Sequence, residues 1–310
     1  MIKKDVAVIG AGNIGRLLTY KLVMAGYNVT LFNRPGSSSQ ANIEEKIKNF
    51  QKEIIANENW GKLTLTFDLS DIKNNQIINY VAGAPRNCNE SRNDLFHKNT
   101  KIVDNFLPTI AANNPDGIII NAANPLDLLT RKIHETLRNN KCNNVIFGMG
   151  SSLDTTRLHD VIKHIANKPF AVIENAFMIG EHGPTMVAVL SSAKLDGKSF
   201  EEIFCLDALE NIVNRTRDRG RQIILETEHS DIIGPAERLF EMNEIITNGQ
   251  EAYLPCCLEN EDGIFMGQMA CFSNGKVTAT KILMNDSEQQ QINYSANQLK
   301  TTWQELNDAT

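Results

Sequence analysis

The segment Val6-Ala-Val-Ile-Gly10-Ala-Gly12-Asn-Ile-Gly15 places three glycines directly after a short apolar run. The apolar run predicts a buried β-strand over residues 5–9, and the spacing Gly-x-Gly-x-x-Gly predicts a turn into a helix over residues 14–25. In such a turn the first glycine makes the bend, the second admits a pyrophosphate, and the third lets helix and strand pack closely. Backbone N–H groups at the helix start would then face the anion. The segment therefore predicts dinucleotide binding; the alternative is a glycine turn without a ligand.

The first half of the chain continues this pattern, because strand-like and helix-like segments alternate along it. The predicted strands cover residues 5–9, 28–32, 63–67, 76–82, 117–122 and 145–147. The predicted helices cover residues 14–25, 39–57, 94–113 and 126–139. Such alternation predicts an α/β fold, with a doubly wound parallel sheet of the Rossmann type covered by helices on both faces.

The second half is less regular and predicts a mixed α/β domain. Helices are expected over residues 153–166, 200–227, 235–247 and 286–307. Strands are expected over residues 175–179 and 185–190, and an antiparallel meander over 251–258, 263–272 and 276–280. We therefore expect a dinucleotide-binding domain over residues 1–147 and a substrate or catalytic domain over residues 148–310.

Composition narrows the class of protein. The 310 residues carry a net charge of −6 with a pI near 5.6, which argues against a general nucleic-acid binder. No apolar run approaches the roughly 20 residues that cross a bilayer, and the first apolar run is too short for a signal peptide. Six cysteines without a C-x-x-C pair fit a reducing compartment, so a cytoplasmic protein is expected, with Cys256 and Cys257 as buried thiols. The histidines are scattered, and no metal site is expected.

The end of the second predicted strand bears on the choice of cofactor. An acidic residue at this place binds the ribose hydroxyls of NAD, whereas this chain has Asn33-Arg34 followed by Ser37, Ser38 and Ser39. An arginine with nearby hydroxyls favours a 2′-phosphate, so the sequence predicts a preference for NADP over NAD. The alternative is a solvated Arg34 and a site that binds NAD.

Four further segments hold residues suited to chemistry on a carboxylic acid. Arg86 and Arg92 follow the strand predicted over residues 76–82, and Asn124 follows the strand over residues 117–122. Asp154 and Arg157 are three residues apart on a predicted helix and therefore share one face. The fourth segment is Gly180-Glu-His-Gly183, between two predicted strands.

In the order and spacing of these motifs the chain resembles the lactate/malate dehydrogenase family, from residue 5 to about residue 190 and more loosely beyond. The resemblance implies a Rossmann domain followed by a mixed α/β catalytic domain. It also implies a nicotinamide-dependent oxidoreductase that acts on a small 2-hydroxy or 2-oxo acid. A homodimer or homotetramer is the assembly that the family leads us to expect.

The resemblance also implies a role for each polar residue. His182 would be the acid–base at the substrate oxygen, and Asp154 would hold its other ring nitrogen. Arg157 would bind the substrate carboxylate with two parallel hydrogen bonds, and Arg92 would polarise the carbonyl as its loop closes. Asn124 would donate a hydrogen bond near the carbonyl and the nicotinamide. The predicted cofactor-binding residues are Gly10, Gly12, Asn13, Ile14, Gly15, Asn33, Arg34 and Asn124.

The expected substrate follows from Arg86. In the malate branch of the family an arginine at this place pairs with the second carboxylate of oxaloacetate, whereas the lactate branch has a neutral residue. We therefore expect malate and oxaloacetate as substrates. Asn89, Pro184 and Asp231 depart from the family pattern, and an Asp231 that faced the pocket would repel a carboxylate or attract an amino or hydroxyl group.

Three alternatives remain open. The first is a dehydrogenase for another 2-hydroxy acid, lactate-like, branched or hydroxylated, which a panel of 2-oxo acids would distinguish. The second is a dinucleotide-binding sensor without turnover, against which the intact set His182, Asp154, Arg157 and Arg92 argues. The third is a reductase of the ketopantoate or opine type, which has no reason to contain the Gly-Glu-His-Gly segment.

Overall fold

The chain forms two compact units in a computed structural model, which describes residues 4–36, 40–84, 91–227 and 230–308. The first unit consists of Met1–Phe147, Ile232–Ala252 and Phe272–Val277. The second consists of Gly148–Asp231, Tyr253–Cys271 and Thr278–Thr310. Two later segments of the chain thus return to the first unit. A single domain boundary after residue 147 stays a prediction.

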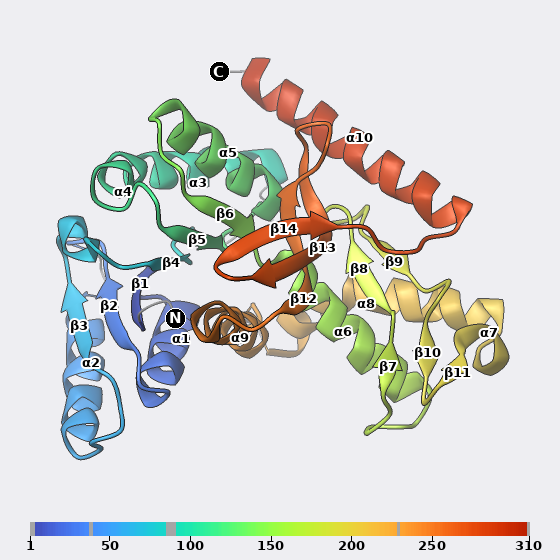
Figure 1. Ribbon diagram of the computed structural model, residues 1–310, viewed down its shortest axis with the longest axis horizontal. Helices are drawn as coiled ribbons and strands as arrows, with labels where there is room; N and C mark the ends of the chain where they lie inside the picture. The colour runs from blue at the N-terminus through green and yellow to red at the C-terminus, as the bar shows by residue number, and fades with distance from the viewer. Residues whose placement is uncertain (1–3, 37–39, 85–90, 228–229, 309–310) are drawn as a thin grey trace. The chain divides into compact units, whose positions relative to one another are not determined.

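The core of the first unit is a parallel sheet, coloured from blue to green in Figure 1. Its six strands lie in the order β6-β5-β4-β1-β2-β3, which is the order of a Rossmann fold. The bounds are β1 Asp5–Ile9, β2 Asn28–Phe32, β3 Leu63–Thr66, β4 Ile77–Tyr80, β5 Ile118–Asn121 and β6 Val145–Gly148. Every residue of β4 and β5 is buried, as expected for strands covered on both faces. The predicted fold class is confirmed in this unit.

Helices connect these strands and cover the sheet. They are α1 Asn13–Met24, α2 Gln40–Ile55, α3 Arg92–Asp104, α4 Leu107–Asn113 and α5 Leu126–Asn139, with a 3₁₀ turn at Leu69–Ile72. A sixth helix, α9 Ile233–Asn248, comes from much later in the chain and packs against α1. Asn79 of β4 and Asn243 of α9 are both fully buried and exchange two hydrogen bonds, of 3.2 and 2.9 Å.

The helix predicted over residues 94–113 is instead two helices, so that prediction was wrong in one detail. Pro108 lies in the first turn of α4, where its missing N–H costs no helical hydrogen bond. The helix α3 begins with a capping box, in which Ser91 accepts a hydrogen bond from the N–H of Asp94 and donates its own N–H to the carboxylate. The Ser91 hydroxyl and the Ser91 N–H both donate to the Asp94 carboxylate, and these two hydrogen bonds hold its pKa below the usual range.

The second unit contains the helices α6 Gly150–Ile165, α7 Phe200–Ile203, α8 Leu206–Thr227 and α10 Asp286–Asp308. Its hairpin β8 Phe177–Ile179 and β9 Val187–Val189 packs against α6 and α10. The small strands β7 Ile173–Glu174, β10 Lys194–Leu195 and β11 Lys198–Ser199 form a three-stranded sheet. Apolar side chains of α6, α7, α8 and the hairpin form one buried cluster that includes Leu158, Ile162, Met178, Phe200 and Ile212.

The C-terminal meander was predicted and is present as β12 Ala252–Glu259, β13 Phe265–Ser273 and β14 Lys276–Thr280. Cys257 of β12 pairs antiparallel with Gly148, and Cys256 and Cys257 are both fully buried, as expected. All five cysteines in the described ranges are free thiols.

Within the described residues, no helix is long and apolar enough to span a membrane. The same part of the chain holds no group of three or more histidine, cysteine, aspartate or glutamate side chains arranged to bind a metal ion.

Candidate active site

The glycine turn between β1 and α1 is shaped by its contacts with the loop after β4. Gly10 has a φ of +115°, which favours glycine, and a Cβ there would lie 2.8 Å from the backbone of Ala82. A Cβ on Gly15 would lie 1.9 Å from the carbonyl oxygen of Gly10, so helix and turn can pack only around a hydrogen atom. A Cβ on Gly12 would meet nothing within 4 Å. Gly12 is therefore the glycine that leaves open space beside the turn.

The start of α1 fits the pyrophosphate of a nicotinamide dinucleotide. Gly12 is its N-cap, no side chain caps the first turn, and no acidic residue lies there. Gly12 and Asn13 are exposed, whereas Gly15 is buried. Unpaired N–H groups and the positive end of the helix dipole together favour an anion at this place.

Arg16 adds a cation to the same turn, and the sequence analysis missed it. Its guanidinium donates to the carbonyl oxygen of Ala11 at 3.1 Å and to Oδ1 of Asn13 at 2.7 Å. Its place one turn into α1 was a signal that could have been used, because that spacing brings a long side chain back over the helix start.

The end of β2 has no carboxylate. Asn33 is buried and donates its N–H to the carbonyl oxygen of Thr66, while Arg34 is exposed in the loop that follows. The serines Ser37, Ser38 and Ser39 lie outside the described residues.

Asn99 of α3 connects the loops that follow β4 and β5. Its side chain is buried, accepts a hydrogen bond from the N–H of Ala84 at 2.7 Å and donates to the carbonyl oxygen of Asn124 at 2.6 Å. Asn121 holds the same turn from the other side, since its Nδ2 donates to Thr130 at 2.9 Å and its Oδ1 accepts from the N–H of Ala123 at 2.9 Å. Asn124 is thus positioned by two asparagines that the sequence analysis did not identify.

Only one of the two predicted loop arginines, Arg92, lies within the described residues. Arg92 is the first residue of α3, directly after the cap Ser91. Arg86 lies outside the described residues, as does Asn89.

In the second unit the predicted acid–base pair is assembled. Nδ1 of His182 lies 2.6 Å from Oδ2 of Asp154, and the side chain of Asp154 is only 3% exposed. His182 retains 16% side-chain exposure. A buried carboxylate on one ring nitrogen fixes the orientation of the imidazole, with Nδ1 as the nitrogen that Asp154 holds.

The turn that carries His182 is fixed at both ends. Gly180 exchanges two backbone hydrogen bonds with Gly267 of β13, at 2.9 and 2.7 Å. The N–H of Glu181 donates to Oγ of the buried Ser295 on α10 at 2.8 Å, and the Glu181 carboxylate accepts from the Thr185 hydroxyl at 2.6 Å. Ser295 and Gly267 come from distant segments and were missed by the sequence analysis.

Arg157 contacts two carboxylates. Its Nη1 lies 3.4 Å from Oδ1 of Asp154 and its Nη2 lies 3.1 Å from Oδ2 of Asp231. The side chains of Arg157 and Asp231 are 14% and 18% exposed. Asp154 is thus shared between the predicted acid–base and the predicted carboxylate anchor, and Asp231 does face this cluster.

His159, two residues beyond Arg157 on α6, has a different environment. Its Nε2 lies 2.9 Å from the carbonyl oxygen of Ala176, and burial lowers its pKa below the usual range. A neutral ring that donates to a backbone carbonyl is a structural histidine, which supports His182 as the acid–base of this unit.

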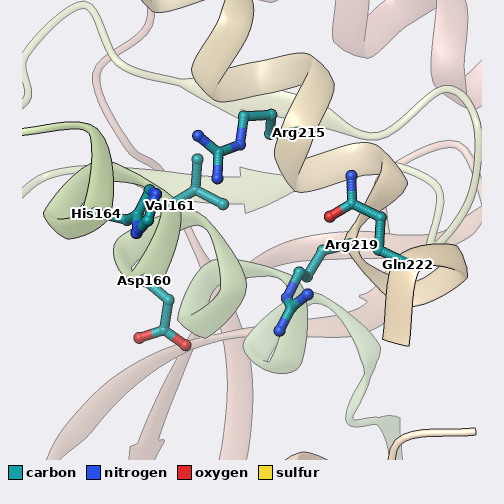
Figure 2. A pocket seen from close by; sticks show the side chains of 6 residues that line it. All are labelled: Asp160, Val161, His164, Arg215, Arg219 and Gln222. Atoms are coloured by element: carbon teal, nitrogen blue, oxygen red, sulfur yellow. The ribbon is translucent and has the colours of Figure 1, made fainter. Parts of the chain in front are cut away.

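A separate hollow of about 290 Å³ lies between α6 and α8, and Figure 2 shows the side chains that line it. Asp160, Val161 and His164 line it from α6, and Arg215, Arg219 and Gln222 line it from α8. Arg219 also pairs with Glu226 at 3.3 Å. These residues are not among the predicted site residues, and the hollow is distinct from the His182 cluster.

The fold and the cluster together define a class of protein, a nicotinamide-dependent dehydrogenase with a carboxylate-oriented histidine. Comparison with protein-family sequence models gives two matches. The lactate/malate dehydrogenase NAD-binding domain matches residues 4–146, and the alpha/beta C-terminal domain of the same family matches residues 151–309. The chain therefore belongs to the lactate/malate dehydrogenase family and is a 2-hydroxy acid oxidoreductase that uses a nicotinamide cofactor.

Individual relatives match over almost the whole chain. A malate dehydrogenase of Aliarcobacter butzleri is 32% identical over 97% of this chain and 96% of its own length. A malate dehydrogenase of Staphylococcus saprophyticus is 29% identical over 99% of each chain. Among solved structures, the malate dehydrogenase of Archaeoglobus fulgidus in complex with NADH has a TM-score of 0.82 at 25% identity, covering 98% of this chain and 99% of that chain.

Proposed function

We propose that this chain interconverts malate and oxaloacetate. The observation that carries the proposal is the cluster in which Asp154 contacts both His182 and Arg157, because it couples a proton-transfer group to a carboxylate anchor. Full-length relatives named malate dehydrogenase support the choice of acid.

The residues divide the work as follows. Arg157 binds the substrate's carboxylate next to the carbonyl, and Arg92 and Asn124 contact the carbonyl oxygen. When bound, the nicotinamide supplies the hydride in reduction and accepts it in oxidation. His182 gives its Nε2 proton to the oxygen as oxaloacetate is reduced and takes it back when malate is oxidised, while Asp154 stabilises the imidazolium. Arg86 pairs with the second carboxylate.

The cofactor preference is a separate proposal. The exposed Arg34 and the absence of a carboxylate at Asn33 favour a 2′-phosphate, so we propose that NADP is preferred over NAD. NADH and NADPH are compared at concentrations well below saturation. Equal rates, or faster rates with NADH, would contradict the preference, and Arg34→Ala is expected to weaken NADPH binding more than NADH binding.

The activity itself is tested by following oxidation of the reduced cofactor with oxaloacetate. His182→Asn is expected to lower kcat about 10²- to 10⁴-fold, since it removes the acid–base but keeps a polar side chain. His164→Asn, at an exposed histidine of α6, is the matched control and should leave kcat unchanged. Cofactor binding without turnover of any 2-oxo acid by the unmodified protein would favour the sensor alternative.

A second test addresses the acid. Arg86→Gln is expected to lower kcat/KM for oxaloacetate far more than for pyruvate, because only the dicarboxylate loses a charge partner. Equal losses would favour another 2-hydroxy acid as the substrate.

We also propose a cytoplasmic homodimer or homotetramer. The free thiols in the described ranges support a reducing compartment, and the family resemblance supports the assembly. Light scattering after size-exclusion chromatography measures the oligomer, and a monomer would contradict this proposal.

A further inference from the structure

Asp231 stands where a ligand of Arg157 would be expected. Its Oδ2 is 3.1 Å from Nη2 of Arg157, and both side chains are more than four-fifths buried. Asp231 directly precedes Ile232, the N-cap of α9. The contact joins residues 74 positions apart, which makes it a feature of the tertiary structure.

The guanidinium of Arg157 contacts two carboxylates and lies close to the backbone of α8. Asp154 contacts Nη1, Asp231 contacts Nη2, and a Cβ on Gly220 of α8 would lie 3.4 Å from Nη1. Its Nε is buried and has no hydrogen-bond partner among the described residues. Each terminal nitrogen thus contacts one carboxylate, and the Nε–H contacts none in the described part of the chain.

The local charge balance follows from these contacts. Asp154 and Asp231 are two carboxylates that contact the single guanidinium of Arg157. A substrate carboxylate that binds the two terminal nitrogens of Arg157 adds a third negative charge at contact distance. It binds with full strength only if Asp231 moves away from Nη2, since like charges at this distance repel.

We propose that Asp231 is a specificity-determining residue that serves as an internal carboxylate. It holds Arg157 in the substrate-free protein, and a substrate carboxylate must displace it. The inference rests on the proposed function in one respect, namely that Arg157 binds the substrate carboxylate. Asp231 thereby raises the KM for every carboxylate substrate, and raises it most for a dicarboxylate, whose second negative charge it also repels. In the substrate-free protein the contact also gives Nη2 of the mostly buried Arg157 a charged partner beside the one that Asp154 provides for Nη1.

The test replaces Asp231 by Asn, which keeps an acceptor oxygen for Arg157 but removes the charge. Asp231→Asn is expected to lower the KM for oxaloacetate about tenfold, the size of one charge-assisted hydrogen bond, with kcat within about threefold. The KM for pyruvate should fall by a smaller factor. Asp218→Asn is the matched control, because it removes an exposed carboxylate of α8. Its KM values should equal those of the unmodified protein.

A binding measurement separates this proposal from the proposed function. Oxamate, a non-reacting carboxylate analogue, is titrated by calorimetry into protein saturated with reduced cofactor. Tighter binding by Asp231→Asn than by the unmodified protein supports the internal carboxylate, whether or not oxaloacetate is turned over. Unchanged or weaker binding, or a KM that stays the same or rises, overturns it.

A second variant covers the case in which the amide of Asp231→Asn still accepts a hydrogen bond from Arg157 and holds it in place. Asp231→Ala should show the same fall in KM together with a lower Tm without ligand, and a larger rise in Tm on adding oxamate than the unmodified protein shows. An equal rise in Tm for both proteins would contradict the proposal.

Discussion

At the scale of single residues, Gly150 determines how His182 can lie. A Cβ at position 150 would be 2.7 Å from Cγ and 2.9 Å from Nδ1 of the imidazole, and Nδ1 is the ring atom that contacts Asp154. The first residue of α6 is therefore packed directly against the face of the acid–base, and the space left by the missing side chain is filled by the ring.

Gly150→Ala should lower kcat at least about tenfold, because the added methyl group pushes the imidazole out of its 2.6 Å contact with Asp154. The fold should survive, since alanine is the better helix former by roughly 0.5–1 kcal/mol. The measurement is kcat for oxaloacetate beside Tm. Gly117→Ala in the first unit is the control, because its Cβ would meet no atom closer than 3.5 Å, and its kcat should equal that of the unmodified protein. A wild-type kcat in Gly150→Ala would show that the ring tolerates the methyl group.

Some residues of the site could be predicted from the sequence and others could not. Asp154, Arg157 and His182 were identified because their motifs are local and ordered along the chain, and the structure brings all three together. Ser295 and Gly267, which fix the turn around His182, lie about 110 and 85 residues beyond it, and no local pattern connects them to it.

At the scale of elements, the turn between β1 and α1 combines two glycines with opposite requirements. Gly15 has no room for a Cβ because of the Gly10 carbonyl oxygen, whereas Gly12 has open space. The first is needed for the backbone to pack and the second for a ligand to approach.

Gly12→Ala and Gly15→Ala should therefore fail in different ways. Gly12→Ala is expected to keep its Tm within about 2 °C and to bind reduced cofactor at least about tenfold more weakly, because its methyl group occupies the space of the pyrophosphate. Gly15→Ala should lose several degrees of Tm, since its Cβ meets backbone at 1.9 Å. Thermal unfolding and fluorescence titration with NADH measure both effects. Equal losses of Tm in the two variants would contradict this division.

Most elements could be predicted from periodicity, and the exceptions have physical causes. The break between α7 and α8 lies at Phe204, which is extended and buried in the apolar cluster of the second unit, so tertiary packing ends a helix that local periodicity continues. The hairpin of β10 and β11 turns at Asp196 and Gly197, both with positive φ. An Asp-Gly pair is a strong hairpin signal, but strands of two residues are too short for an alternating pattern.

At the scale of the whole molecule, α9 is the segment that makes the first unit discontinuous. It packs on α1, where Lys21 and Glu237 form an ion pair of 2.6 Å, and on β4 through the buried Asn79–Asn243 pair. The alternation of strands and helices could not predict that α9 packs on the first unit. Asn79 and Asn243 are separated by 164 residues, and nothing in the local sequence marks either asparagine as buried.

Asn243→Ala should destabilise the protein by roughly 1–3 kcal/mol, because it leaves the fully buried amide of Asn79 without its partner. Lys21→Ala removes a partly exposed ion pair between the same two helices and should cost less than about 1 kcal/mol. Urea unfolding of both variants gives the comparison. A smaller loss for Asn243→Ala than for Lys21→Ala would mean that α9 is held mainly by its surface charges.

The discontinuity of the first unit also has a consequence for synthesis. Its sheet strands β1 to β6 are made first, but Ile232–Ala252 and Phe272–Val277 leave the ribosome only after the intervening segment Gly148–Asp231 of the second unit. Until then the nascent sheet has an uncovered apolar surface and the amide of Asn79 has no partner from α9. The dinucleotide-binding unit is thus begun early and completed only when these later segments emerge, and until then its uncovered apolar surface favours aggregation of the nascent chain.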